Sequence, residues 1–183
     1  LLPRGIPGRW LGVIAVLPLF LVVPAGPRFG EVRIAVLDVG QGLAVVARTQ
    51  HHALVYDAGP LFTAEADSGS RIVVPYLRAA GIRRLNGIVV THADNDHSGG
   101  IAAVLAAVPL DWMLSSLPES SDLHQAAGVS KPCHAGQRWE WDGVRFELLH
   151  PPLESYGVER MRANDRSCVL RIETPAARVL LTG

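Results

Sequence analysis

The chain has 183 residues, of which 49% are hydrophobic, and its formal net charge at pH 7 is +0. A chain of this length and apolar content can bury one sizeable core, so extensive disorder is excluded and one main domain is expected. The even balance of charge excludes a polycationic chain, so any attraction to phosphate groups must come from a local patch.

The N-terminal part of the chain differs from the rest. A charge-free apolar run covers residues 10–23, interrupted only by Pro18. About 14 residues is short of the roughly 20 that a straight membrane-spanning helix needs, so we interpret residues 1–29 as the end of a membrane segment and a linker in a piece of a longer protein. Arg4 and Arg9 precede the run, and the bias of basic residues toward the cytoplasm would place the chain that follows outside it. Residues 30–183 are expected to form the main domain.

The main domain is predicted to contain short strands and at least two helices. The polar stretch 64–70 is expected to be a loop. Helices are predicted over 72–80, ending at Gly81, and over 101–108, ending at Pro109. Strands at both ends with helices between them predict an α/β fold in which helices cover two sheets. The predicted strands are 32–37, 43–47, 52–56, 87–91, 112–114, 138–141, 144–150, 168–172 and 178–181.

Potential metal ligands cluster where the buried strand predicted over 87–91 ends. Loops at the carboxyl ends of such strands can aim several side chains at one point. Two divalent ions held there could activate a water molecule and stabilise both the attacking and the leaving oxygen of a hydrolysis. A polar turn that caps a helix near Ser98 is the structural alternative, but capping needs no imidazoles. The four residues are His92, Asp94, Asp96 and His97.

The spacing of these four residues predicts how they divide. Alternate residues of an extended loop lie on the same side. His92 and Asp94 are therefore expected to hold one ion, and Asp96 and His97 the other.

The chain contains two cysteines, Cys133 and Cys168, without Cys-x-x-Cys spacing. This spacing favours neither a disulfide framework nor a thiolate zinc site. Both are therefore expected to be small residues of the core. The four tryptophans are also expected in the core or at an interface, although Trp139 and Trp141 share one face of a predicted strand.

Residues 91–100 resemble the metal-binding motif of the metallo-β-lactamase superfamily, in which His-x-His-x-Asp-His follows a buried strand. Asp94 stands where the second histidine usually sits, and a carboxylate there shifts metal preference from Zn²⁺ toward Mn²⁺ or Mg²⁺. Asp57, followed by Ala58 and Gly59, resembles the earlier Asp-x-Gly, which braces the metal loop without usually being a ligand. The resemblance implies an αββα sandwich and a centre with two divalent ions, Mn²⁺ or Zn²⁺.

Four motifs together carry a narrower resemblance. They are Asp-Val-Gly-Gln-Gly at 38–42, the histidine motif at 92–100, Asn-Asp-Arg-Ser at 164–167 and Leu-Leu-Thr-Gly at 180–183. In combination they resemble the C-terminal domain of ComEC-type competence proteins, over about residues 30–183. The resemblance implies a nuclease-like domain of a bacterial inner-membrane DNA channel, on the extracytoplasmic side, that degrades the DNA strand that is not imported. Its implied partners are single-stranded DNA, the rest of the channel and other competence proteins.

The same resemblance bears on residues outside the cluster. Asp38 and Gln41 are expected to line the site, against the alternative of a tight glycine turn in which Asp bonds nearby backbone. The superfamily's third histidine has no clear counterpart. Asp165 is the expected ligand there, with Asn164 beside it and His150 as a rival, although His150 also fits a strand end before a Pro-Pro turn.

The superfamily's bridging aspartate normally follows the Leu-Thr-Gly that ends here at Gly183. We therefore expect a sandwich truncated at its C-terminal side, with low metal affinity or activity in this fragment alone.

The main functional hypothesis is phosphodiester hydrolysis of DNA. Asp96 would hold the second ion and take up a proton, and arginines near the cleft would hold the strand. Hydrolysis of a thioester or lactam is a second hypothesis, which Asp94 disfavours because a carboxylate suits harder metals and phosphate oxygen. The third is a non-catalytic domain that binds DNA or a channel partner.

Overall fold

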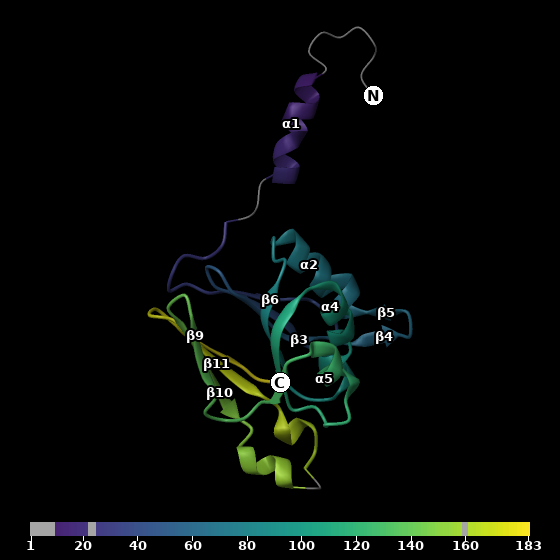
Figure 1. The fold of residues 1–183 in the computed structure, drawn as a ribbon, viewed down its shortest axis with the longest axis vertical. Helices are drawn as coiled ribbons and strands as arrows, with labels where there is room; N and C mark the ends of the chain where they lie inside the picture. Colours follow the sequence, from purple (N-terminus) through teal and green to yellow (C-terminus); the bar gives the residue numbers. More distant parts are fainter. Residues whose placement is uncertain (1–9, 22–24, 159–160) are drawn as a thin grey trace.

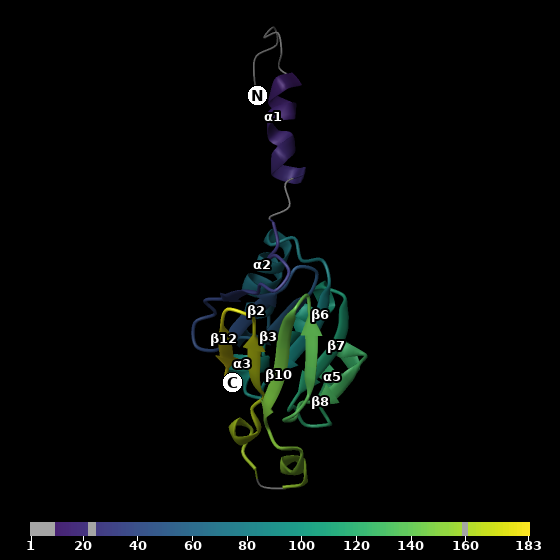
Figure 2. The same cartoon turned by 90° about the vertical axis from the view of Figure 1, so that its left-hand side faces the viewer.

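The computed structural model describes residues 10–21, 25–158 and 161–183 (Figure 1). Helix α1 (Trp10–Leu21) covers most of the apolar run and stands apart from the other elements in Figures 1 and 2. In the described ranges, none of the helices combines the length and the apolar character that crossing a membrane requires. Arg4 and Arg9, on which the predicted orientation depends, lie outside these ranges.

A six-stranded mixed sheet forms the centre of the domain, in the order β1-β2-β3-β6-β7-β8. The pairs β1–β2 and β2–β3 are antiparallel, whereas β3, β6, β7 and β8 run parallel. Because parallel strands end at the same edge, the residues that follow β3, β6 and β7 meet there. The strands are β1 (Arg33–Val36), β2 (Ala44–Arg48), β3 (Ala53–Ala58), β6 (Leu85–Val90), β7 (Leu110–Ser115) and β8 (Ser130–Pro132).

A second, antiparallel sheet has the order β12-β11-β10-β9. The strands predicted over 138–141, 144–150 and 178–181 are confirmed at those bounds. Asp142 and Gly143 join β9 and β10 with φ of 51° and 78°, as the tightest hairpin turns require. The strands are β9 (Arg138–Trp141), β10 (Val144–His150), β11 (Val169–Glu173) and β12 (Arg178–Leu181).

The outer face of this second sheet is lined by paired charges. Arg138 and Arg171 both form ion pairs with Glu147. Arg145 and Arg178 both form ion pairs with Glu173. Arginine and glutamate thus alternate across neighbouring strands, which is a favourable cross-strand arrangement for a solvated face. Within the described ranges no helix covers this face (Figure 1).

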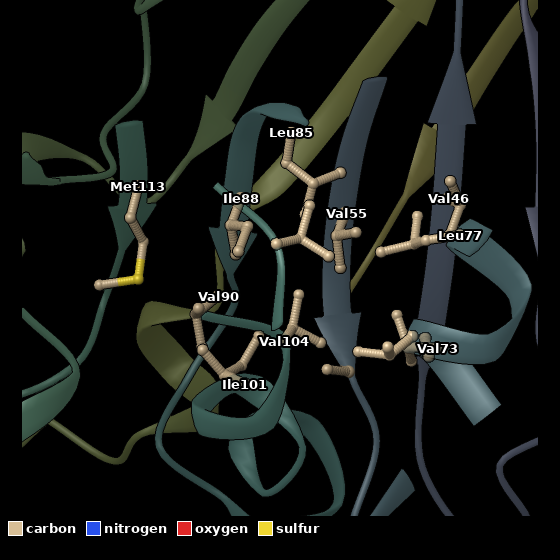
Figure 3. Close-up of a cluster of buried hydrophobic side chains, with 14 of the residues drawn as sticks. Val46, Val55, Val73, Leu77, Leu85, Ile88, Val90, Ile101, Val104 and Met113 are labelled. Carbon is tan, nitrogen blue, oxygen red and sulfur yellow. The ribbon is translucent and has the colours of Figure 1, made fainter. Parts of the chain in front are cut away.

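Three layers make up the domain: helices, the six-stranded sheet and the four-stranded sheet (Figures 1 and 2). Alternate residues of the central strands point to opposite faces. Val46, Val55 and Ile88 meet side chains from the helices (Figure 3), whereas Val45, Leu54 and Tyr56 face the second sheet. The covering helices are α2 (Val74–Ala79), α4 (Ile101–Ala107) and α5 (Asp122–Ala127). This arrangement confirms the predicted α/β sandwich of two stacked sheets, with helices over the six-stranded sheet only among the described residues.

The polar stretch 64–70 is not the loop that was predicted. It contributes to a small hairpin, β4 (Leu61–Thr63) and β5 (Ala66–Asp67), and to the π-helical turn η1 (Gly69–Val73) that leads into α2. The buried Ser68 hydroxyl donates hydrogen bonds to the carbonyl oxygens of Ala58 and Pro60. These hydrogen bonds link Ser68 to the end of β3. They fix a polar segment whose own sequence favours an irregular loop.

The prediction that the two cysteines are core residues is confirmed, but the disulfide that their spacing disfavoured is present. Both are fully buried, but they form a disulfide with a Cα–Cα separation of 6.1 Å. Cys133 follows β8 and Cys168 precedes β11, so the bond ties the two sheets together. Their separation of 35 residues holds no local signal, because only the packing of one sheet on the other brings them together.

Candidate metal centre

The predicted ligand loop leaves the buried end of β6. Thr91 is fully buried and His92 is 3% exposed. The Thr91 carbonyl oxygen accepts hydrogen bonds from the Cys168 amide, at 3.1 Å, and from the Ser116 hydroxyl. These bonds come from the second sheet and from the end of β7, so both flanking elements position the start of the loop.

The short helix α3 (Asn95–Ser98) follows this loop. Asp94 stands at its N-cap, yet its side chain makes no capping hydrogen bond. Asn95 instead holds the helix against β4 by exchanging hydrogen bonds with the Leu61 amide and carbonyl. The capping alternative therefore fails for Asp94, and its carboxylate stays available to a ligand.

The four predicted ligands come together in the two expected pairs. His92 Nε2 lies 3.6 Å from Asp94 Oδ2, and His97 Nε2 lies 3.8 Å from Asp96 Oδ2. The two imidazole rings are 4.1 Å apart between centroids. Two ligands that bind one ion at about 2.1 Å are separated by about 3.4 Å in tetrahedral geometry and by about 3.0 Å in the octahedral geometry of Mg²⁺. The spacing within each pair is too long for a hydrogen bond, and a small movement of the side chains would bring the two atoms to the separation of ligands that share an ion.

Asp57 orients His97, the imidazole of the second pair. It is the next-to-last residue of β3, with its side chain fully buried and its φ at 56°. Its carboxylate accepts hydrogen bonds from the Thr91 amide at 2.8 Å, the Thr91 hydroxyl at 2.7 Å and His97 Nδ1 at 2.7 Å. A carboxylate on Nδ1 leaves the Nε2 lone pair of His97 free, which is the usual support of a metal-binding histidine. The bracing role that the resemblance implied is thus visible in these contacts.

His92 is held by hydroxyl groups. Its Nδ1 lies 2.8 Å from Thr91 Oγ1 and 3.2 Å from Ser167 Oγ. Ser167, just before the disulfide, was missed by the sequence reasoning. The only signal for it was the Asn-Asp-Arg-Ser motif, in which Asn164 and Asp165, and not Ser167, were the candidate ligands.

The expected third ligand is not gathered with these four. Asp165 and Asn164 are exposed on the 3₁₀ turn η3 (Asn164–Arg166), so a ligand role for Asp165 stays a prediction. His150 Nδ1 lies 2.9 Å from the Ser167 carbonyl oxygen, which suits the strand-end reading of that histidine.

Burial and charge separate the two histidines. Burial lowers the pKa of His92, which favours the neutral imidazole that binds metals. Burial also acts to lower the pKa of His97, but the hydrogen bond and charge of Asp57, with the charges of Asp96 and Asp94, outweigh it and raise that pKa. Burial raises the pKa of Asp57 despite its three hydrogen bonds. Protons therefore compete with a cation more strongly at His97 than at His92.

The glycine-rich turn between β1 and β2 lies against this loop. The Leu43 amide donates to the Asp96 carbonyl at 3.1 Å, and a side chain at Gly42 would overlap that oxygen. Asp38 and Gln41 are exposed, and Asp38 accepts a hydrogen bond from the Gly40 amide at 3.2 Å. This is the hydrogen bond expected for an aspartate in a tight glycine turn. That Asp38 and Gln41 line the metal site stays a prediction.

The donor set fits an ion only in part. Across the described stretches, no group of three or more His, Cys, Asp or Glu side chains is gathered closely enough to hold a metal. Each pair supplies one imidazole nitrogen and one carboxylate oxygen, and further ligands would complete each site. Gly183, which follows β12, packs against the Thr91 side chain, so the end of β12 also lies beside the loop.

A sequence model of the metallo-beta-lactamase superfamily matches residues 37–183. The chain belongs to this superfamily. Solved metallo-β-lactamases share the fold: a Cronobacter sakazakii enzyme with a HARLDQ motif aligns with TM-score 0.56 and 17% identity over 86% of this chain and 59% of its own. The Rm3 metallo-beta-lactamase aligns with TM-score 0.53 and 16% identity over 90% of this chain and 63% of its own.

Among curated proteins, this metallo-β-lactamase domain is similar to parts of larger bacterial proteins. It is 38% identical to Competence protein ComA of Neisseria gonorrhoeae over 100% of this chain and 24% of the relative. It is 33% identical to Recombination protein 2 of Haemophilus influenzae, over 80% of this chain and 17% of the relative. The chain therefore spans about a quarter or less of the length of these relatives.

Proposed function

We propose that this domain hydrolyses phosphodiester bonds of DNA during DNA uptake, with divalent ions held by the pairs His92–Asp94 and His97–Asp96. The observation that carries the proposal is that each pair joins an imidazole to a carboxylate at 3.6–3.8 Å. Carboxylate oxygen makes a harder site than imidazole alone, which favours Mn²⁺ or Mg²⁺ and substrates with phosphate oxygens. The similarity to competence proteins supports DNA as the substrate class and a bacterial membrane protein as the setting.

The side chains in and around the two pairs have different roles in the proposed hydrolysis. When bound, divalent ions supply Lewis-acid chemistry, which acidifies water and neutralises developing charge on phosphate. Asp57 fixes the tautomer of His97, and hydroxyl groups orient His92. The side chains of Asp94 and Asp96 are each 50% exposed, so the site opens toward solvent. The carboxylate of Asp96 would take up the proton of an attacking water.

A substrate comparison tests this proposal. The full-length protein loaded with Mn²⁺ is expected to degrade a single-stranded oligonucleotide, to stop when the metal is chelated and to resume when Mn²⁺ is restored. At equal metal loading it should turn over a small thioester and a β-lactam far more slowly. Faster turnover of either would favour the second hypothesis, and DNA binding without any bound ion in metal analysis would favour the non-catalytic one.

We also propose that the domain lies on the extracytoplasmic side of the bacterial inner membrane. The Cys133–Cys168 disulfide supports this placement, because disulfides persist in oxidising compartments and are rare in the cytoplasm.

The state of these cysteines in cells is a direct check. When cells are lysed in a denaturing buffer that contains an alkylating reagent, both cysteines are expected to escape modification unless a reductant is added first. The Cys133→Ser variant should lose roughly 3–4 kcal/mol of unfolding free energy, because the bond closes a loop of 35 residues. Denaturant unfolding measures this loss, and adding a reductant to the unsubstituted protein is the matched control. Alkylated cysteines in untreated cells would contradict the placement.

A further inference from the structure

Arginines gather at the end of the domain that lies opposite the metal loop. The metal loop leaves the carboxyl end of β6, whereas Arg83 and Arg84 immediately precede that strand. Arg48 ends β2 and pairs across the sheet with Arg33 at the start of β1. We call this surface the arginine end; its six arginines are Arg28, Arg33, Arg48, Arg78, Arg83 and Arg84.

Contacts between distant segments build this surface. The Arg48 guanidinium donates to the Ala80 carbonyl at 2.7 Å, beyond the end of α2 that carries Arg78. The same guanidinium lies against Gly26, close to Arg28. A pocket of about 260 Å³ opens here, lined by Arg48, His51, His52, Arg83, Arg84 and Asn86 among others.

The acidic residues at this end are already engaged. Asp111 pairs with Arg84 and accepts a hydrogen bond from Asn86. Asp142 accepts hydrogen bonds from the Thr49 hydroxyl and the His51 amide and pairs with His52. Glu31 bonds the Arg28 backbone amide at 3.0 Å.

Within the described part of the chain, four exposed arginines of this end make no side-chain ion pair, in contrast to the paired arginines of the four-stranded sheet. Asp57, Asp94 and Asp96 lie together at the opposite, metal-binding end, although the formal charge of the whole chain is +0. The arginine end, with its six arginines against the carboxylates of Glu31, Asp111 and Asp142, carries an excess of positive charge. The four arginines are Arg28, Arg33, Arg78 and Arg83.

The apolar N-terminal helix joins the domain at this same end. Pro27 is buried, and the Gly30 amide donates to the Asp142 carbonyl at 2.7 Å, which attaches the linker to the β9–β10 turn. Helix α1 exposes large apolar side chains, among them Leu11 at 67% and Ile14 at 63%. The linker thus brings an apolar element to the arginine end. In Figures 1 and 2, α1 lies beyond the end of the domain near α2, and the C-terminus lies farther from it.

We propose that the arginine end docks on the phosphate headgroups of an anionic phospholipid surface. Guanidinium groups bind phosphate oxygens in pairs of parallel hydrogen bonds, and basic clusters beside an apolar segment are attracted to anionic lipid. The connection to the exposed helix α1 favours lipid over nucleic acid, because apolar side chains are attracted to lipid and not to the charged backbone of DNA. Docking in this way turns the metal loop away from the membrane, toward material arriving from outside. The inference stands on the charge distribution and does not depend on the proposed hydrolysis.

Vesicle flotation tests the proposal with the 183-residue chain. Vesicles of phosphatidylcholine alone are compared with vesicles that contain about one third phosphatidylglycerol. Because α1 can associate with either, the measured quantity is the ratio of the two partition constants. The ratio is expected to be at least tenfold and to fall as salt is added.

Matched double variants locate the lipid contact. Arg78→Gln with Arg83→Gln is expected to reduce the phosphatidylglycerol preference about tenfold. Arg138→Gln with Arg171→Gln removes the same charge from the outer face of the four-stranded sheet and should keep the preference within about twofold. Circular dichroism confirms that both variants are folded.

Three outcomes would overturn the proposal. They are equal binding to both vesicle types, equal losses in the two variants, and an unchanged lipid preference in Arg78→Gln/Arg83→Gln. If that variant keeps the lipid preference but binds single-stranded DNA more weakly, the arginine end is a nucleic-acid surface.

Discussion

The Asp96→Ala variant is expected to lose DNA hydrolysis, with turnover reduced about 10³-fold or more. Asp96 supplies the only carboxylate paired with His97 Nε2 among the described residues, at 3.8 Å, and its removal leaves that ion with a single ligand from the loop. It also removes the group positioned to take up the proton of the attacking water. Initial rates on a single-stranded oligonucleotide, with metal content measured on the same samples, check this result.

Glu119→Ala is the matched control for Asp96→Ala. Glu119 is exposed and lies outside the metal loop, so this variant loses the same charge and should keep the full rate. If Asp96→Ala also kept the full rate, the assignment of the loop as the hydrolytic centre would be wrong. If both variants lost activity equally, the effect would be one of overall charge.

The Asp57→Asn variant is expected to lower metal affinity about 10–100-fold without unfolding the domain. Asparagine tolerates the φ of 56° at this position, so the backbone is conserved. Its oxygen can still accept from the Thr91 amide, but its amino group would face His97 Nδ1, which in the native protein donates to the Asp57 carboxylate. His97 would change tautomer and protonate Nε2, the atom that faces Asp96.

Calorimetric titration of Mn²⁺ into the apo protein measures this effect independently of catalysis. The control is Thr91→Ser, which keeps the hydroxyl that donates to Asp57 and should change affinity by no more than a few-fold. Unchanged affinity in Asp57→Asn would show that the brace does not govern how His97 binds metal.

Local patterns predicted most of the strands and the cluster of candidate ligands, whose role in metal binding stays a prediction. Strands were predicted at β3 and β6, the second of them buried, and the structure places them side by side in parallel. The pairing of His92 with Asp94 follows from the two-residue period of an extended loop, which is a local property of the backbone. Parallel strands then bring Asp57 to the same edge, so two motifs far apart in the chain meet where the resemblance placed them.

The amino-acid sequence by itself determined which residues form the ligand loop and which strand ends in it, because alternation of side chains and burial are encoded within a few neighbouring positions. Only the tertiary structure decided what surrounds that loop. The contact of Ser167 with His92 spans 75 positions, and the disulfide spans 35. Both depend on how one sheet packs on the other, and so does the arginine end, whose members are scattered along the chain. Such contacts arise from packing that no local periodicity records.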